Sequence, residues 1–280
     1  MSTWFRDGEP VTSVPIGDRA LQYGDGLFET VAVRDGQLRL WDRHLARLRT
    51  GCAKLGLDVP DADRLQREVE LALQQNETEG PNCVVKLIVS AGNGERGYGR
   101  LNTTGTLLVG VFPRQGVEPD ARKNGITTML CKTRLAISSA TAGLKTLNRL
   151  EQVLGRSECL RADCFEGLMQ DADGRVICGT MSNVFAVSKN SLVTPYLGRC
   201  GVAGVMRDFA IDVFRRHGLD VAVRDFELDE LWRSNEFFLT NSQFGALPVR
   251  TCEHHEFHVG GVTRDCIALL AENGIAECAS

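Results

Sequence analysis

One lysine of the chain is placed where it could do covalent chemistry. Lys145 lies between a run of small residues, 138–143, and a helix that the spacing of Leu147, Leu150 and Leu154 predicts. Because these leucines recur at helical intervals, we expect them to share one buried face. The small residues would let a planar ligand approach the backbone, and a lysine amine can act there as a nucleophile or a general base. The alternative is a solvated loop lysine, which spacing alone favours.

Two further positions are candidates for a functional role. Arg47 lies beside the apolar stripe of a helix predicted over 42–56. The glycine-rich stretch 201–207 leads into a helix that continues to His217, and free backbone N–H groups at a helix start attract a phosphate dianion. From spacing alone, the alternatives are a solvated helix arginine and an ordinary turn.

Composition limits the classes of protein to which the chain can belong. It has 280 residues, of which 43% are hydrophobic, enough for one large domain or two of ordinary size. The net charge is -4 with both signs interspersed, which indicates a small-molecule partner and neither nucleic acid nor a membrane surface. The ten cysteines form no Cys-x-x-Cys pair and several lie in apolar patterns, so we interpret most of them as reduced thiols that fill the core. The chain shows neither a signal-like start nor a stretch long enough to span a bilayer, so we expect a cytoplasmic protein.

The apolar patterns predict helices and strands on both sides of one boundary. Strands are expected at 3–6, 27–33, 37–40, 83–90, 106–112, 126–131, 168–171, 175–178 and 236–240, and helices at 42–56, 61–75, from the lysine segment to about 161, up to His217 and at 261–272. The glycine-punctuated stretch 15–26 is expected to be irregular. Prolines, a glycine and charges between Pro113 and Asp120 are typical of an interdomain linker. We therefore predict an N-terminal α/β domain over 1–113, a linker over 114–120 and a C-terminal α/β domain over 121–280.

Two other motifs are weaker candidates for binding sites. Gly92–Gly97 is a G-x-G-x-x-G after a strand, but the turn-rich residues 98–105 do not predict the helix that dinucleotide binding requires. His254, His255 and His258 could ligate a metal, yet no second ligand cluster accompanies them. We interpret the histidine segment as a solvated turn and expect no metal site.

Several segments, in order along nearly the whole chain, resemble one family. Residues 143–154, Gly-Leu-Lys-Thr-Leu-Asn-Arg-Leu-Glu-Gln-Val-Leu, resemble the cofactor-lysine segment of the fold type IV enzymes that use pyridoxal 5'-phosphate (PLP). The other matching segments are Asp-Arg-x-x-Gln-Tyr-Gly-Asp-Gly at 18–26, His-x-x-Arg-Leu at 44–48, Ser-Asn-x-Phe at 182–185 and Gly-Val-Met-Arg at 204–207. Within that superfamily, the continuation Asn-Arg-Leu-Glu-Gln is most similar to the 4-amino-4-deoxychorismate lyases.

The resemblance implies a fold, a cofactor and an assembly. The fold would be α/β in two domains, like that of the D-amino-acid aminotransferases, with PLP in the cleft between the domains. The protein would be a homodimer whose substrate pocket is completed at the dimer interface. Its reaction would convert 4-amino-4-deoxychorismate to 4-aminobenzoate and pyruvate. Two alternatives stay open, which are a fold type IV aminotransferase for branched-chain or D-amino acids and a PLP-binding protein without catalytic activity.

The resemblance also implies roles for individual residues. Lys145 would bind PLP covalently and then move protons as base and acid. The phosphate would be held by the guanidinium of Arg47, by the backbone of two residues at a helix start and by two polar side chains, namely Val205, Met206, Asn241 and Ser242. The substrate would contact a strand of the first domain and a neighbouring loop, through Phe28, Thr30, Arg96 and Tyr98.

Two positions depart from the family pattern. Cys178 occupies the position where the pattern has a glutamate beside the PLP ring nitrogen, and a thiol is a weaker hydrogen-bonding partner that carries no stable negative charge. Ala91 stands where many lyases of this family carry an arginine. We therefore expect Cys178 to contact the cofactor ring without an ion pair, and the recognition of a substrate carboxylate near Ala91 is left without an assigned residue.

Overall fold

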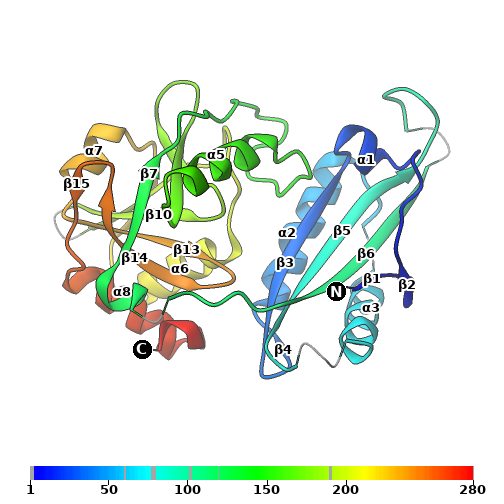
Figure 1. The fold of residues 1–280 in the computed structure, drawn as a ribbon, viewed down its shortest axis with the longest axis horizontal. Coiled ribbons are helices and arrows are strands. Elements are labelled where there is room, and N and C mark those ends of the chain that lie inside the picture. Colours follow the sequence, from blue (N-terminus) through cyan, green and yellow to red (C-terminus); the bar gives the residue numbers. More distant parts are fainter. Residues whose placement is uncertain are drawn as a thin grey trace. The chain divides into compact units, whose positions relative to one another are not determined.

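Two compact units make up the chain (Figure 1). The structure is a computed structural model, and it describes residues 3–59, 61–76, 80–100, 103–118, 120–188 and 191–279. Unit 1 comprises Met1–Gln115 and the short segment Leu144–Asn148, and unit 2 comprises Gly116–Gly143 and Arg149–Ser280. The sequence placed Lys145 in the C-terminal domain, whereas its segment packs within unit 1.

Unit 1 is built on a six-stranded antiparallel sheet. The strands are β1 (Thr3–Arg6), β2 (Glu9–Val11), β3 (Gly26–Arg34), β4 (Gln37–Leu38), β5 (Cys83–Asn93) and β6 (Thr104–Pro113), in the order β2-β1-β6-β5-β3-β4. The strands expected at 3–6, 27–33, 83–90 and 106–112 are confirmed. β4 is shorter than the strand expected at 37–40, and β5 continues to Asn93 through an irregularity in register after Ser90.

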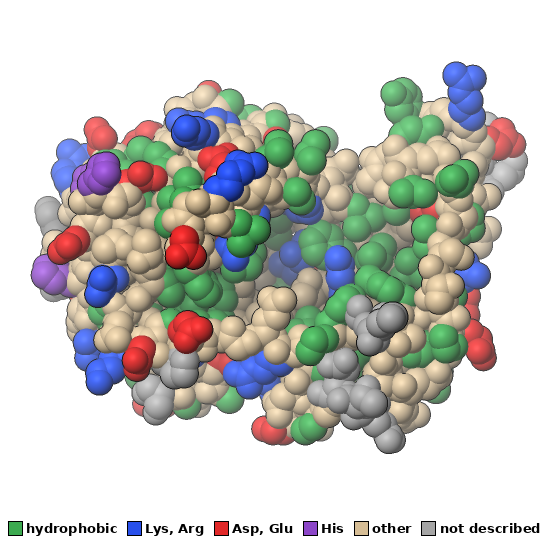
Figure 2. Space-filling model, in the orientation of Figure 1, with side chains coloured by type: hydrophobic (Ala, Val, Ile, Leu, Met, Phe, Trp, Pro, Cys, Tyr) green, Lys and Arg blue, Asp and Glu red, His purple; other side chains and the backbone are tan. Residues whose placement is uncertain are grey.

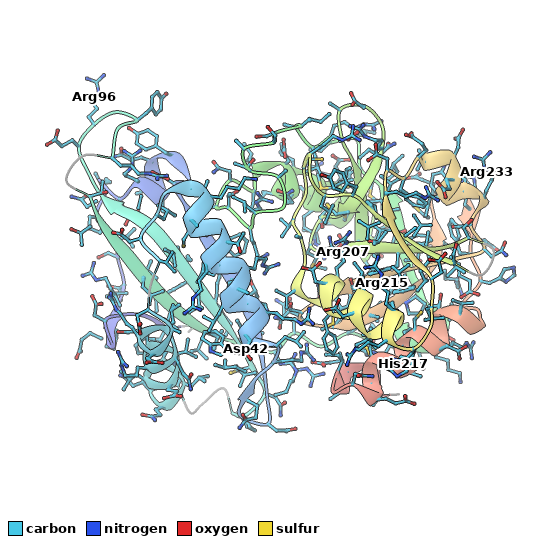
Figure 3. The ribbon with its side chains drawn as sticks, turned by 180° about the vertical axis from the view of Figure 1, so that it is seen from behind. Asp42, Arg96, Arg207, Arg215, His217 and Arg233 are labelled. Atoms are coloured by element: carbon cyan, nitrogen blue, oxygen red, sulfur yellow. The ribbon has the colours of Figure 1, made fainter. Side chains whose placement is uncertain are left out.

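Two helices cover one face of this sheet. Helix α2 (Trp41–Leu55) and helix α3 (Ala62–Gln74) lie behind the strands in Figure 1 and in front of them in Figure 3. Their apolar side chains, such as Leu48 and Leu65, enter one core with Val31 and Val85 of the strands. Each such burial stabilises the unit by about 1.5–3 kcal/mol relative to an exposed side chain.

The other face of the sheet carries half-buried side chains. Because side chains alternate along a strand, Phe28 and Thr30 of β3 point away from α2 and α3, as do Lys86 and Ile88 of β5. We call these four residues the open face of unit 1. Figure 2 shows hydrophobic side chains gathered over β3, β5 and β6, with basic side chains among them.

A short helix replaces the irregular segment expected at 15–26. Helix α1 (Arg19–Tyr23) begins after Asp18, whose carboxylate accepts a hydrogen bond from Ala20 N (2.8 Å), and ends at Gly24 in the left-handed conformation. The glycine punctuation that suggested an irregular loop thus marks the end of a helix.

Unit 2 is built on a nine-stranded mixed sheet. Its strands are β7 (Ile126–Leu130), β8 (Glu166–Gln170), β9 (Val176–Gly179), β10 (Asn183–Ser188), β11 (Ser191–Pro195), β12 (Val221–Arg224), β13 (Glu236–Asn241), β14 (Gly245–Cys252) and β15 (His255–Glu256). The order is β12-β11-β10-β13-β14-β7-β8-β9, with β15 paired to β14, so the strands expected at 126–131, 168–171, 175–178 and 236–240 belong to one sheet.

Helices flank this second sheet. They are α4 (Ala121–Asn124), α5 (Leu150–Arg161), α6 (Val205–Arg216), α7 (Leu228–Arg233), α8 (Gly261–Glu272) and the 3₁₀ helix η2 (Ala276–Cys278). Helices α6 and α8 pack on β13, where Phe185, Phe214 and Phe238 form a cluster of aromatic rings 5.1 to 6.1 Å apart. The expected last helix, 261–272, is confirmed.

The leucine stripe expected after Lys145 is wrong. Leu150 is 70% exposed and Leu154 is 50% exposed, whereas Gly155 and Cys159 are the buried positions of α5. A Cβ atom at Gly155 would lie 3.2 Å from Thr180 Cγ2 and 3.3 Å from Cys131 Sγ, so α5 approaches the sheet closely along Gly155 and Cys159. This close approach turns the leucines away from the sheet, although their spacing is helical.

Three further expectations concern the cysteines, membrane-spanning helices and the linker between the domains. All ten cysteines are free, and nine of them are buried, which confirms them as core-filling thiols. Among the described residues, no helix is both long and apolar enough to cross a membrane. Of the linker expected at 114–120, residue 119 lies outside the described residues, and 114–118 form neither helix nor strand.

Candidate active site

The backbone of Lys145 is fixed along strand β3. Phe28 N donates a hydrogen bond to Lys145 O (3.0 Å), and Leu147 N donates one to Gly26 O (3.0 Å). Leu144 is buried in the core of unit 1, which anchors the other side of the lysine. The Lys145 ammonium lies 4.1 Å from the centroid of the Phe28 ring. The predicted catalytic lysine and the predicted substrate residue Phe28 are therefore in direct contact.

A buried ion pair lies on the opposite side of β3. Arg47 Nε donates to Glu29 Oε1 (2.8 Å), and the Nδ1 atom of His44 lies 2.6 Å from Glu29 Oε2. Glu29 is only 1% exposed. Burial by itself would raise the pKa of Glu29, but the charge of Arg47 and the hydrogen bonds from His44 and Arg47 outweigh it and lower the pKa to about 2. Glu29 is therefore ionised and compensates the charge of Arg47.

His44 is the neutral member of this group. Burial lowers its pKa, and the nearby positive charges of Arg47 and Lys145 act in the same direction against the hydrogen bond to Glu29. Since a neutral imidazole must donate from Nδ1 to reach the ionised carboxylate, Nε2 is left as an acceptor. Among the described residues, Nε2 of His44 is buried without a hydrogen-bond donor.

The sequence singled out Arg47 but missed Glu29 and His44. Glu29 lies next to Phe28 and His44 lies within the motif that contains Arg47. The contacts of Glu29 with His44 and Arg47, however, depend on α2 packing against β3, which the motifs do not predict. One local signal was available. Glu29 lies between Leu27 and Val31 on the core face of its strand, and a buried carboxylate needs a hydrogen-bonding or charged partner.

The loop that carries Arg96 and Tyr98 is tied to helix α1. The guanidinium of Arg19 is buried and donates to the carbonyls of residues 97, 98 and 99 at 2.9 to 3.1 Å, while its Nε donates to Asp25 (2.8 Å). Tyr98 is 88% exposed, and its ring lies 5.5 Å from that of Tyr23. Figure 3 shows Arg96 at the tip of the loop, pointing away from the sheet. Neither side chain forms a hydrogen bond or ion pair with another predicted site residue in the described part of unit 1.

In unit 2, helix α6 begins with backbone N–H groups that have no partner within the helix, directly after Gly204. Gly204 precedes the helix, and a Cβ atom there would lie 2.0 Å from Asn183 Oδ1, so the position excludes other residues. Asn183 Nδ2 donates to Val202 O (3.0 Å) and so fixes the approach to the helix. The side chains of Val205 and Met206 are buried, which leaves their backbone N–H groups at the positive end of the helix dipole.

Arg207 anchors the first turn of α6 (Figure 3). Its Nε donates to Thr194 Oγ1 (3.0 Å) and its Nη2 to Pro195 O (2.9 Å), so the helix start is tied to the end of β11. Burial lowers the pKa of Arg207, against the charge of Asp208. The sequence named Arg207 only as part of a motif and missed this anchoring contact.

Asn241 is committed to the turn after β13. Its Oδ1 accepts hydrogen bonds from Gln243 N (2.8 Å) and Phe244 N (2.9 Å), and its Nδ2 donates to Met181 O (3.3 Å). The side chain therefore shapes the turn that carries Ser242, which is half-buried.

A buried carboxylate that the sequence missed organises the neighbouring turn. Glu166 is 0% exposed and accepts five hydrogen bonds. Four of them, from Gly167 N, Thr180 N, Met181 N and Ser182 Oγ, are 2.8 to 3.2 Å long, and the fifth comes from Thr180 Oγ1. These hydrogen bonds offset the desolvation cost of burying the Glu166 carboxylate. Glu166 thereby fixes the backbone between Cys178 and Asn183, and Met181 in turn contacts Asn241.

Cys178 is buried and neutral. Its desolvation raises the pKa of the thiol to about 12, although the positive charge of Arg149 acts in the opposite direction. The side chain at this position is therefore a protonated thiol at neutral pH. Glu166 cannot replace the missing carboxylate, because the Thr180–Ser182 turn occupies both of its oxygens.

Comparison with known proteins identifies the family. Residues 26–252 match the family model described as amino-transferase class IV. The chain belongs to the class IV aminotransferase family. The crystal structure of 4-amino-4-deoxychorismate lyase from Pseudomonas aeruginosa is 42% identical, with a TM-score of 0.90 over 97% of this chain and 99% of that one. The aminodeoxychorismate lyase of Vibrio harveyi is 34% identical over 92% of this chain and 96% of its own length.

Class IV aminotransferases use PLP. A hypothetical aminotransferase from Mycobacterium tuberculosis, solved in its PLP-bound form, is 25% identical with a TM-score of 0.84 over 98% of this chain and 99% of that one. Each unit of the present chain carries a group whose chemistry suits a part of this cofactor. The amine of Lys145 suits the aldehyde, and the side-chain-free start of α6 at Gly204 suits a phosphate. At Cys178, the position predicted to face the ring nitrogen, a neutral thiol is a weaker hydrogen-bonding partner than a carboxylate.

Proposed function

We propose that this chain is a PLP-dependent lyase that converts 4-amino-4-deoxychorismate to 4-aminobenzoate and pyruvate. The observation that carries the proposal is similarity over nearly the whole chain to two enzymes named as this lyase, at 42% and 34% identity. The contact between Lys145 and Phe28 supports it, since it brings an amine to a half-buried aromatic surface.

The phosphate of the cofactor is held by several groups. The backbone N–H groups of Val205 and Met206 supply donors and Arg47 supplies a positive charge. Ser242 and the second N–H of Asn241 Nδ2, whose first N–H donates to Met181 O, supply polar contacts. The fixed geometry of α6, which Arg207 ties to β11, supports this role because a rigid helix start loses little entropy on binding an anion. Glu29 holds the Arg47 guanidinium in one orientation.

Lys145 performs the proton transfers. When bound, PLP withdraws electrons from the carbon next to the substrate amine. The Nζ of Lys145 removes the proton from C4 of the substrate, the bond between the ring and the enolpyruvyl oxygen breaks, and the ring becomes aromatic. Aromatisation makes this step strongly downhill. Lys145 then returns the proton to the methylene carbon of the leaving enolpyruvate, which becomes pyruvate. His44, on the opposite side of β3, stays neutral and takes no part in this proton transfer.

Substrate contacts, assembly and location complete the proposal. Phe28 and Thr30 contact the substrate ring from the open face of unit 1. The protein is a homodimer, and the exposed Arg96 and Tyr98 act at the pocket that the dimer interface completes. The enzyme works in the cytoplasm.

An aminotransferase is the second candidate. The family description and the Mycobacterium tuberculosis neighbour favour it, since both are named for that reaction. The neutral thiol of Cys178 weighs against it, because transamination relies more heavily on a protonated cofactor ring. A PLP-binding protein without turnover would keep the cofactor spectrum and perform neither reaction.

One purification followed by two assays decides between the candidates. Holoprotein is mixed with 4-amino-4-deoxychorismate, and pyruvate and 4-aminobenzoate are measured. In parallel, holoprotein is mixed with D-alanine or with L-leucine, and conversion of bound PLP to pyridoxamine phosphate is followed. Equal release of pyruvate and 4-aminobenzoate identifies the lyase. Pyridoxamine phosphate without 4-aminobenzoate identifies the aminotransferase.

A further inference from the structure

A second lysine of unit 1 lies against the same aromatic ring as Lys145. The ammonium of Lys86 is 5.1 Å from the centroid of the Phe28 ring, and that of Lys145 is 4.1 Å from it. Lys86 comes from β5 and Lys145 from the segment along β3, so two separate parts of unit 1 direct cations at one ring. The sequence analysis gave Lys86 no role.

The surroundings of Lys86 hold its ammonium without neutralising it. Its cross-strand neighbours are Thr30 on β3 and Gly110 on β6, and Trp4 lies beyond Gly110 on β1. The Lys86 ammonium is 6.0 Å from the Trp4 ring. A Cβ atom at Gly110 would lie 2.9 Å from the Trp4 ring, so the glycine leaves space for that ring to lie over the strand. The two aromatic rings attract the cation but carry no countercharge.

This cation lacks an acidic partner. Lys86 is half-buried, and within the described residues no carboxylate forms an ion pair with it. Burial lowers its pKa, which shows that desolvation disfavours the charged form. A partly desolvated cation without a countercharge is costly, and an anionic ligand would remove that cost.

Two other buried cations of unit 1 are compensated. Arg19 is paired with Asp25, and Arg47 is paired with Glu29. Ala91, where the resemblance predicts an arginine in many lyases, is buried and supplies no charge. Among these positions, Lys86 is the one that offers an uncompensated charge on the open face beside Lys145.

We propose that Lys86 binds a carboxylate of the substrate. This inference rests on the proposed function, whose substrate carries two carboxylates, one on the ring and one on the enolpyruvyl group. Lys145 engages the amine end, the Phe28 ring supports the substrate ring, and Lys86 neutralises a carboxylate on the far side of Phe28. Lys86 is a binding residue and takes no part in proton transfer.

Three variants of the holoenzyme test the assignment. Lys86→Met removes the charge and keeps the length of the side chain, Lys86→Arg keeps the charge, and Lys54→Met removes an exposed lysine of α2 as a matched control. We expect Lys86→Met to raise KM for 4-amino-4-deoxychorismate by about tenfold or more, as the loss of a charge-assisted hydrogen bond predicts. The kcat value, the visible spectrum of the cofactor and its covalent fixation by borohydride should stay unchanged. Lys86→Arg should have a KM close to that of the wild type, and the KM of Lys54→Met should equal the wild-type value.

Inhibition by 4-aminobenzoate identifies which carboxylate is bound, since this product keeps the ring carboxylate and lacks the other. If Lys86→Met weakens both inhibition and KM, Lys86 binds the ring carboxylate. If KM alone changes, it binds the enolpyruvyl carboxylate. The inference is overturned if KM of Lys86→Met equals that of Lys54→Met, or if Lys86→Arg is as impaired as Lys86→Met. A wild-type enzyme that releases no pyruvate would instead overturn the proposed function, and this inference with it.

Discussion

Glu29 and Arg47 form a buried ion pair in which one carboxylate accepts two hydrogen bonds from one guanidinium. The pair joins strand β3 to helix α2, and it lies on the face of β3 opposite Phe28. A residue predicted to hold the phosphate of the cofactor is thus also part of the core of unit 1. Changes at Arg47 should therefore affect both cofactor binding and folding, and the two effects can be separated through Glu29.

Replacing Glu29 by glutamine should destabilise the protein in a pH-dependent way. The folded-state pKa of Glu29, about 2, lies below its ordinary value of 4.5, so its stabilising effect is present above the ordinary value and is lost as the pH falls toward 2. A shift of this size corresponds to about 3 kcal/mol at neutral pH. Urea unfolding at pH 7, 5, 4 and 3 should show a wild-type advantage that shrinks with acid. The exposed Glu70→Gln is the control, and a constant gap across this range would contradict the prediction.

Lys145 should be the residue that binds the cofactor covalently. The holoprotein should have a visible absorbance band that borohydride fixes to the chain, and Lys145→Ala should abolish that fixation. Peptide mapping of the reduced protein locates the label. Lys86→Met is the matched control, because its ammonium contacts the same Phe28 ring and should leave the label in place. A label on any other lysine would exclude the assignment.

Arg47→Ala should weaken the binding of PLP. Each charge-assisted hydrogen bond from the guanidinium contributes about 1.5–3 kcal/mol, so affinity should fall at least roughly tenfold. Arg49→Ala on the exposed side of α2 should leave it unchanged. Equilibrium dialysis of apoprotein with PLP measures the effect. Unchanged affinity in Arg47→Ala would limit this residue to its pairing with Glu29.

Glu166→Gln should lower cofactor affinity although we assign Glu166 no contact with the cofactor. The substitution replaces one acceptor oxygen with a donor that faces the donors of the Thr180–Ser182 turn, so the turn and its contact with Asn241 should shift. Glu158→Gln is the control, since Glu158 accepts hydrogen bonds from residues 132 and 133 in a different loop. Equal PLP affinity in the two variants, at equal Tm, would show that Glu166 only stabilises the fold.

Local motifs predicted the parts of the site that are fixed by short stretches of chain. The helix start at Gly204 and the strand carrying Phe28 were predicted correctly because a few neighbouring residues determine each of them, and the role of Lys145 stays a prediction from its own segment. The pairs Glu29–Arg47 and Glu166–Thr180 were missed because each depends on two elements packing together, and one sequence does not reveal that packing. The same limit explains the exposed Leu150, since the spacing of leucines identifies a helix but not the face that meets the sheet.

Cys178 stands where the resemblance predicts a glutamate, and this position bears on the choice of reaction. A glutamate at this position would favour a protonated cofactor ring, which withdraws electrons strongly. The buried thiol has a pKa of about 12, so at neutral pH it offers no negative charge. The ring should be neutral more often than in the relatives. A neutral ring handicaps transamination more than an elimination that aromatisation assists.

Cys178→Glu should therefore raise any side transamination by a larger factor than it raises lyase turnover. Arg149, whose positive charge acts on position 178, should help to keep the new carboxylate ionised. Cys178→Gln introduces a side chain of nearly the same size as glutamate but without its charge. It therefore separates the effect of charge from that of packing. Both activities are measured in all three proteins, together with the visible spectrum of the cofactor, which should change only in the glutamate variant. Equal gains in the two reactions, or a larger gain for the lyase, would show that the ring nitrogen does not set the reaction preference. In that case the thiol only fills space beside Met169 and Ile177 in its core cluster.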